Sequence, residues 1–135
     1  MSEAQATIEV LLVEDSPADA RLTQEVLKGG DIRKHLTVVR DGVEALSYLR
    51  REGRYRDAPR PDVVLLDLNL PKMDGQEVLK RIRTDPALWT IPVIVLTTSG
   101  AEGDVAGALA EQAVSYLQKP VDLIEFTRIV EGLVA

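Results

Sequence analysis

The sequence predicts an α/β fold in which helices cover both faces of one parallel β-sheet. Five apolar runs alternate with five amphipathic stretches along the 135 residues, and this alternation is typical of right-handed βαβ units. Three of the apolar runs are almost continuously apolar in the middle, as expected of parallel strands that are covered on both faces. A chain of this length buries about 70% of the surface that its unfolded form exposes, which is enough for one core.

The predicted strands are the apolar runs, and their number favours one particular sheet. They cover residues 7–13, 35–40, 62–67, 91–97 and 114–118. Five strands in a small doubly wound domain indicate the flavodoxin-like order 2-1-3-4-5, in which strands 1 and 3 are central neighbours. Sheets of this kind bind ligands beyond the carboxyl ends of their strands, so those ends are where we look for a site.

The amphipathic stretches between the strands predict five helices. Ser16 and Asp74 are positioned as N-caps, and Gly29 with Gly30 ends the first helix. The longest irregular piece, 53–61, is predicted to be a surface loop. The predicted helices cover residues 17–28, 42–52, 75–84, 101–112 and 122–134.

Other features of the chain also carry expectations. Residues 50–60 hold five arginines and two acids, which we interpret as a solvated loop, with a partner-docking patch as the alternative. Trp89 is expected to pack over the end of the third helix, and His35, the only histidine, begins an edge strand.

Composition excludes several classes of protein. The chain has no cysteine, which removes disulfides, thiolate zinc sites and cysteine nucleophiles. Its formal net charge is −6, so nothing drives it electrostatically toward nucleic acid or anionic lipid. No apolar run approaches the length of a membrane span, and the N-terminus lacks the pattern of a signal peptide. We therefore expect a cytoplasmic protein with no nucleic-acid or membrane partner.

Charged and hydroxyl residues stand at the carboxyl ends of four predicted strands. They are Glu14 and Asp15 after the first strand, Asp67 ending the third, Thr97 ending the fourth, and Lys119 after the fifth. Each pair of carboxylates at ~4 Å repels by roughly 4 kcal/mol at an effective dielectric of 20. Lys119 alone does not offset three acids, whereas Mg²⁺ bound by carboxylates and water does.

A magnesium ion beside an aspartate, a lysine and a threonine is suited to phosphoryl transfer, in which the aspartate can be the nucleophile. The segment after the first strand has no glycine-rich phosphate loop, and its acids would repel a bare phosphate. This argues against a flavin or nucleotide site.

The chain resembles the receiver domains of two-component response regulators over nearly its whole length. Thr97 follows Asp67 by 30 residues and Lys119 follows Thr97 by 22, as the family pattern requires. The motifs that carry the resemblance are VEDS at 13–16, LDLNLPKMDG at 66–75, PVIVLT at 92–97 and YLQKP at 116–120.

The resemblance implies that Asp67 is the phosphoacceptor, which attacks the phosphohistidine of a sensor histidine kinase. It also implies a Mg²⁺ ion, with Mn²⁺ as a substitute. The implied ligands are Asp15, Asp67 and the backbone carbonyl of Asn69, with Glu14 binding through water.

Three other residues receive roles from the same resemblance. Lys119 would contact the phosphoryl group, helped by a cis bond to Pro120. Thr97 would hydrogen-bond a phosphoryl oxygen, and Tyr116 would turn inward to fill the space that Thr97 leaves. We expect the predicted helix 101–112, which contains Gly103 and Gly107, to be loosely held and to respond to this switch.

The resemblance further implies one receiver domain over 1–135, with an ordered core of about 7–134 and no output domain. Such a protein is not an enzyme beyond its own phosphorylation and dephosphorylation. It would signal by protein binding or by phosphorelay to a histidine phosphotransfer protein.

Among single-domain members, the chain is most similar to those paired with bacteriophytochrome kinases, through residues 50–61, 66–71 and 96–99. The apolar residues Leu123, Ile124, Phe126 and Ile129 exceed what one core face absorbs, and predict a homodimer.

Two rival functions remain open at this point. An aspartate-nucleophile phosphatase usually needs a second acid where this chain has Asn69, and the chain is too short for a substrate-covering cap. A pseudo-receiver that never accepts a phosphoryl group would show degenerate acids or a missing lysine, and neither is seen.

Overall fold

The computed structural model describes residues 7–98, 113 and 115–134. One five-stranded parallel sheet organises them, in the predicted order β2-β1-β3-β4-β5. The strands are β1 (Ile8–Val13), β2 (Lys34–Val39), β3 (Val63–Asp67), β4 (Val93–Thr97) and β5 (Ser115–Gln118). The predicted flavodoxin-like sheet is therefore confirmed, and β1, β3 and β4 fill its centre.

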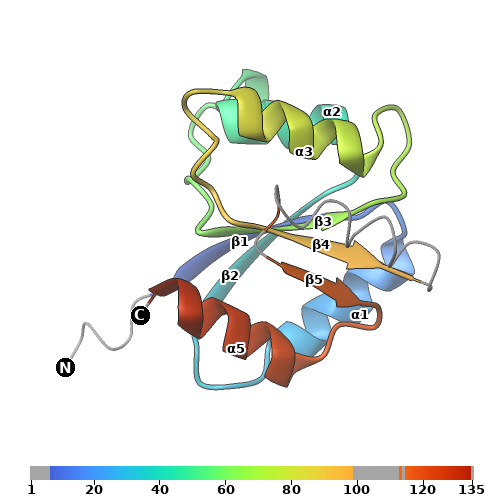
Figure 1. The fold of residues 1–135 in the computed structure, drawn as a ribbon, viewed down its shortest axis with the longest axis vertical. Coiled ribbons are helices and arrows are strands. Elements are labelled where there is room, and N and C mark those ends of the chain that lie inside the picture. The colour runs from blue at the N-terminus through green and yellow to red at the C-terminus, as the bar shows by residue number, and fades with distance from the viewer. Residues whose placement is uncertain (1–6, 99–112, 114, 135) are drawn as a thin grey trace.

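Helices lie on both faces of this sheet. Helices α2 (Gly42–Arg50) and α3 (Gly75–Thr84) cover one face, and α1 (Pro17–Leu27) and α5 (Leu123–Val134) cover the other (Figure 1). The side chains of Ser16, Asp41 and Asp74 cap the first three of these helices along the chain. The predicted helix 101–112 lies outside the described residues. None of the described helices has the length and apolar character needed to cross a membrane.

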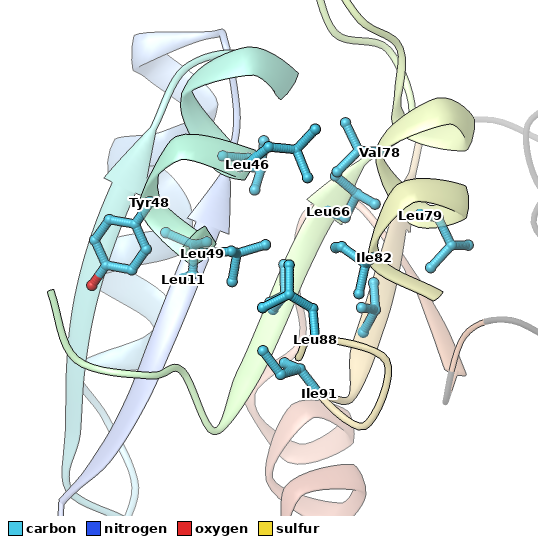
Figure 2. Packing of buried hydrophobic residues seen from close by; sticks show 14 of the residues in the cluster. Leu11, Leu46, Tyr48, Leu49, Leu66, Val78, Leu79, Ile82, Leu88 and Ile91 are labelled. Atoms are coloured by element: carbon cyan, nitrogen blue, oxygen red, sulfur yellow. The ribbon is translucent and has the colours of Figure 1, made fainter. Parts of the chain in front are cut away.

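Two apolar clusters form the core, one on each face of the sheet. Figure 2 shows the cluster under α2 and α3, where Leu46 and Leu49 face Val78 and Ile82 above Leu66. The other cluster lies under α1 and α5 and is centred on the buried ring of Phe126. Because β1, β3 and β4 are covered on both faces, their middles are apolar without alternation.

The predicted surface loop at 53–61 contains a short 3₁₀ helix, Gly53–Tyr55, and the helix before it ends at Arg50 rather than at residue 52. Arg51 ends α2 in the left-handed conformation, with a φ of 58°. Tyr55 then anchors the segment, since its hydroxyl donates to Glu44 Oε2 at 2.6 Å and its ring meets Tyr48 edge-on. Arg54 donates to the same Glu44 carboxylate. The segment is thus partly built into the fold.

The expectation that Trp89 packs over the end of α3 is wrong. Its side chain is 58% exposed. Leu88 and Ile91 fill the core at that end instead, as Figure 2 shows. The backbone of this turn is tied to α3, because Arg83 Nη1 donates to the carbonyls of Trp89 and Ile91 at 2.8 and 2.9 Å.

The dimer prediction assumed that the apolar residues of α5 exceed what one core face absorbs, and most of them do pack into the core. Phe126 is fully buried, and Leu123 and Ile129 pack against the same core cluster. Of the four residues on which the prediction rested, Ile124 alone is largely exposed, at 69%. One face of α5 therefore absorbs more apolar surface than its sequence indicated.

Candidate functional site

The predicted site residues stand at one edge of the sheet because parallel strands point their carboxyl ends the same way. Asp67 ends β3, Thr97 ends β4, and Glu14 continues β1, where its N–H donates to the Val39 carbonyl at 2.9 Å. Lys119 follows β5, and its N–H donates to the Thr97 carbonyl at 2.7 Å. The Lys119–Pro120 peptide bond is cis.

The Lys119 ammonium lies at the centre of a carboxylate cluster. Its Nζ is 2.7 Å from Glu14 Oε1, 2.7 Å from Asp67 Oδ2 and 3.1 Å from Asp19 Oδ2. The side chains of Glu14 and Asp67 are 1% and 3% exposed, and that of Lys119 is 11% exposed. The sheet edge thus contains one buried cation that is shared by three carboxylates.

Burial and mutual contact shift the ionisation of this cluster. Burial raises the pKa of Glu14 to about 7, and the adjacent Asp67 adds to the rise, although the hydrogen bond from Lys119 opposes it. Burial acts to lower the pKa of Lys119, but hydrogen bonds to Asp67 and Glu14 outweigh it and hold that pKa above its ordinary range. Lys119 therefore stays cationic while Glu14 titrates close to neutral pH.

The same edge offers a set of oxygen ligands for a metal ion. Glu14, Asp15 and Asp67 each present a carboxylate oxygen, and these three atoms lie within 4.8 Å of one another. Carboxylate oxygens are the donors that hard cations such as Mg²⁺ and Mn²⁺ prefer. Asp15 is exposed while the other two are buried. The donor set therefore fits a divalent cation that keeps several water ligands.

The loop after β3 is held tightly against the site. The Asn69 N–H donates to Asp67 Oδ1 at 2.9 Å, and the Gly75 N–H donates to the Leu68 carbonyl at 3.0 Å. A Cβ atom at Gly75 would lie 2.5 Å from the Asp67 carbonyl oxygen, so only glycine fits where α3 begins. The start of α3 thereby fixes the backbone on which Asp67 stands.

The two residues with predicted switch roles occupy different environments. Thr97 is buried, at 2% exposure, and Tyr116 on the neighbouring strand β5 is 49% exposed. Val95 of β4 is the register partner of Tyr116, so the tyrosine lies two residues before the level of Thr97. In this structure Tyr116 does not point into the interior beside Thr97.

Asp19 is a member of the site that sequence reasoning missed. It lies in the first turn of α1, where its N–H donates to the Ser16 Oγ cap at 3.2 Å. An acid in a first helical turn is usually explained by the helix dipole alone. The signal that could have identified it is its position, because it lies four residues after Asp15 and in the first turn of the helix that leaves this edge of the sheet.

An open cavity borders the cluster on the α1 side. Its volume is about 260 Å³, and its walls include Asp19, Leu22, Thr98, Lys119 and Pro120. Lys119 is thus reachable from solvent through a partly apolar opening.

His35 lies apart, on β2, where its Nδ1 is 2.8 Å from Glu9 Oε1. This contact is with a strand β1 carboxylate outside the cluster.

Comparison with known proteins gives consistent matches over most of the chain. A family model described as the response regulator receiver domain matches residues 10–131. The response regulator Rcp1 of Synechocystis sp. is 48% identical over 124 residues, which cover 92% of this chain and 84% of that protein.

Solved structures agree with this match. The phosphorylated cyanobacterial phytochrome response regulator RcpA has a TM-score of 0.77 at 47% identity, with 95% of this chain and 91% of that chain covered. The Mn²⁺-bound form of Rcp1 has a TM-score of 0.76 at 48% identity, covering 93% and 91%. The bacteriophytochrome response regulator AtBRR has a TM-score of 0.84 at 40% identity, covering 95% and 93%. The chain therefore belongs to the response regulator receiver domain family and is similar to its phytochrome-associated members.

Proposed function

We propose that this receiver domain accepts a phosphoryl group on Asp67 from the phosphohistidine of a sensor histidine kinase. The observation that carries the proposal is the 2.7 Å contact between Lys119 Nζ and Asp67 Oδ2 inside the buried carboxylate cluster. Phosphoryl transfer depends mainly on positioning and on compensation of negative charge. A buried carboxylate with a fixed cation beside it meets both needs.

A divalent cation completes this charge balance. Glu14, Asp15 and Asp67 are the side chains that would hold it, Glu14 through water, together with the backbone carbonyl of Asn69. When bound, the cation neutralises charge on the phosphoryl oxygens. The cluster of ligand oxygens within 4.8 Å supports this assignment, as does the Mn²⁺ bound to the related Rcp1. Mg²⁺ is the ion we propose, with Mn²⁺ as a substitute.

The reaction is an exchange of one bond to phosphorus for another. A carboxylate oxygen of Asp67 forms a bond to phosphorus while the bond between phosphorus and the histidine nitrogen breaks, and the electron pair returns to the imidazole. Lys119 remains protonated throughout, because contact with the carboxylates holds its pKa above the ordinary range. Its ammonium moves from Glu14 and Asp19 to the phosphoryl oxygens. The movement is short because the ammonium is already hydrogen-bonded to Asp67.

The output of phosphorylation passes through Thr97. Its hydroxyl donates to a phosphoryl oxygen, and Tyr116 turns from its exposed position into the space beside β4. Tyr116 is exposed and Thr97 is buried. We therefore assign the structure described here to the state before this change. The altered surface then binds a protein partner or passes the phosphoryl group to a histidine phosphotransfer protein.

The kinase class is proposed from the relatives. RcpA is a cyanobacterial phytochrome response regulator and AtBRR a bacteriophytochrome response regulator. A bacteriophytochrome histidine kinase is therefore the partner to test first.

We also propose a homodimer, supported by the exposed Ile124 and Tyr116. Light scattering at high concentration that reports a monomer would contradict the dimer without affecting the phosphoacceptor.

The experiment that tests the proposed function is intact mass after incubation with Mg²⁺ and acetyl phosphate. We expect one phosphoryl adduct on the wild type, none on Asp67→Asn, and none when EDTA is added first. Asp57→Asn is the matched control, because Asp57 is an exposed loop carboxylate and its variant should carry the adduct.

Two outcomes would overturn the proposal. An adduct on Asp67→Asn would place the phosphoacceptor elsewhere. The absence of any adduct with acetyl phosphate and with a bacteriophytochrome kinase would make the domain a binding module that accepts no phosphoryl group.

A further inference from the structure

A groove runs between the C-terminal ends of α2 and α3. It consists of two cavities of about 340 and 440 Å³ whose walls share Arg50 and Asp85. Its other basic residues are Arg51 and Arg60 in the first cavity and Lys80 and Arg81 in the second. We call it the arginine groove and define it by Arg50, Arg51, Arg60, Lys80 and Arg81.

The arginine groove has a charge opposite to that of the molecule. Its walls hold five basic side chains against two acidic ones, Glu77 and Asp85, in a chain with a formal net charge of −6. Helix C-termini favour cations, which accounts for basic residues in the last turns of α2 and α3. This does not account for Arg60, which comes from the loop before β3.

Hydrogen bonds fix the walls of the arginine groove. Arg60 donates from Nη1 to the Ala87 carbonyl at 2.8 Å and from Nη2 to Thr90 Oγ1 at 3.0 Å. Arg83 ties the same turn to α3. Leu49 and Leu88, both labelled in Figure 2, form an apolar part of the wall and belong to the core. The groove therefore exists before any partner arrives.

Two basic side chains of the arginine groove are unpaired among the described residues. The side chains of Arg51 and Lys80 are exposed and, among the described residues, make no ion pair or side-chain hydrogen bond. Trp89, which directly follows Leu88 in the chain, is 58% exposed. Arginine and tryptophan are the side chains most enriched where protein interfaces derive their affinity.

We propose that the arginine groove is a docking site for an acidic segment of a partner protein, whose carboxylates pair with Arg51 and Lys80. Charge complementarity commits the site to a short acidic segment of a protein. A nucleic acid is disfavoured because its phosphates would extend beyond the groove over the remainder of a chain whose net charge is −6.

The position of the groove keeps a docked partner away from the phosphoacceptor. The turn after α3 lies at the end of the sheet opposite the tips of β4 and β5 (Figure 1). Asp67, which ends β3, and Lys119, which follows β5, stand at the end with the strand tips. A partner held in the groove leaves the phosphoacceptor accessible. Binding should therefore not depend on phosphorylation, and this inference stands whether or not Asp67 is the phosphoacceptor.

The probe for the test is a synthetic peptide, Glu-Glu-Leu-Glu-Glu-Leu-Glu-Glu, with a glutamine-for-glutamate version as its control. Trp89 is the only tryptophan in the chain and directly follows Leu88 of the groove wall, so its fluorescence is the readout of binding near this surface. At about 0.02 M salt, where screening is weak, we expect a saturable change in emission with the acidic peptide only. We expect about 0.5 M salt to abolish it.

Two double variants locate the binding. Arg51→Gln with Lys80→Gln removes two groove charges, and we expect the dissociation constant to rise about fivefold. Arg21→Gln with Arg33→Gln removes two exposed charges elsewhere and should leave it unchanged. Circular dichroism confirms that both double variants are folded.

The opposite results would overturn the proposal. An equal loss of affinity in both double variants would mean diffuse attraction, and unchanged binding in the groove variant would mean another site. Tighter binding of an oligothymidylate of matched charge would replace the protein partner by a nucleic acid. A change in peptide affinity after phosphorylation would contradict the independence of the two ends.

Discussion

The middles and the ends of the central strands are equally buried, but they serve opposite purposes. Leu65, Leu66 and Ile94 are 0% exposed, and the next residue after Leu66, Asp67, is 2% exposed. Burying a leucine contributes about 1.5–3 kcal/mol to stability. Burying an ion costs several kcal/mol, which contact with a partner charge only partly offsets.

The difference teaches that burial alone does not identify what holds the fold together. The apolar middles stabilise the domain and are indifferent to pH and metal. The charged ends place Glu14 and Asp67 around one ammonium, with more negative than positive charge. Such a cluster reduces stability until a cation or a proton is added, and this is what makes it responsive.

The largest expected effect comes from removing the cation at the charged end. Lys119→Met leaves Glu14 and Asp67 buried without their partner, and we expect it to lower the free energy of unfolding by about 3–5 kcal/mol at pH 8. Urea unfolding measures this. Lys28→Met is the control, since Lys28 pairs with Glu25 at the surface and should cost under about 1 kcal/mol. Equal losses would show that burial of the cluster is energetically unimportant.

A similar loss is expected in the apolar middle, with a different dependence on conditions. Leu66→Ala should lower the free energy of unfolding by about 2–5 kcal/mol through the cavity that it leaves. Because no titrating group is changed, the loss should be the same at pH 5 and pH 8 and with or without Mg²⁺. A loss that varies with pH would mean that the two regions are not separable.

A stabilising substitution is expected at the charged end. The pKa of Glu14 is about 7 in the folded protein against an ordinary value of 4.5, so the folded state binds more protons between these pH values. Stability therefore falls as pH rises through that window. Glu14→Gln removes this loss, and we expect it to stabilise the metal-free protein by about 1–3 kcal/mol at pH 8.

The check is the difference in unfolding free energy between Glu14→Gln and the wild type across pH 4.5 to 8. It should be small at the acidic limit, where Glu14 is protonated in the folded state and half protonated in the unfolded state, and should grow toward pH 8. A difference that shrinks with rising pH would mean that Lys119 governs the ionisation of Glu14 more strongly than burial does.

The smallest effect is expected at the rim of the cluster. The Asp19 side chain is 46% exposed although its carboxylate is 3.1 Å from Lys119 Nζ. Exposed pairs contribute little, so Asp19→Asn should change the unfolding free energy by less than about 1 kcal/mol. Its stabilisation by Mg²⁺ should equal that of the wild type. A loss as large as that of Lys119→Met would place Asp19 with the buried acids.

Much of this architecture follows from the sequence by simple rules. The helix predicted over 75–84 is α3, because Asp74 caps it and its apolar residues repeat at helical spacing. The convergence of Glu14, Asp67 and Lys119 was predictable because parallel strands share one carboxyl edge. Neither inference needs side-chain detail.

The rest depends on tertiary detail that no local pattern contains. The contact of Asp19 with Lys119 is set by how α1 leaves β1 and by the reach of a long side chain. Arg51 adopts a left-handed conformation that favours glycine, and nothing nearby in the sequence announces it. Trp89 is exposed because Leu88 and Ile91 already fill the available core. The predicted helix 101–112 stays a prediction.

The most direct test of the account is the free energy of unfolding of the wild type and Asp67→Asn, each with Mg²⁺ and with EDTA. The account predicts that Mg²⁺ stabilises the wild type, by about 2.7 kcal/mol at a hundredfold excess over its dissociation constant. Asp67→Asn should be at least as stable as the wild type in EDTA and should gain little from Mg²⁺. Equal stabilisation of both proteins by Mg²⁺, or a clear loss of stability in Asp67→Asn with EDTA, would contradict it.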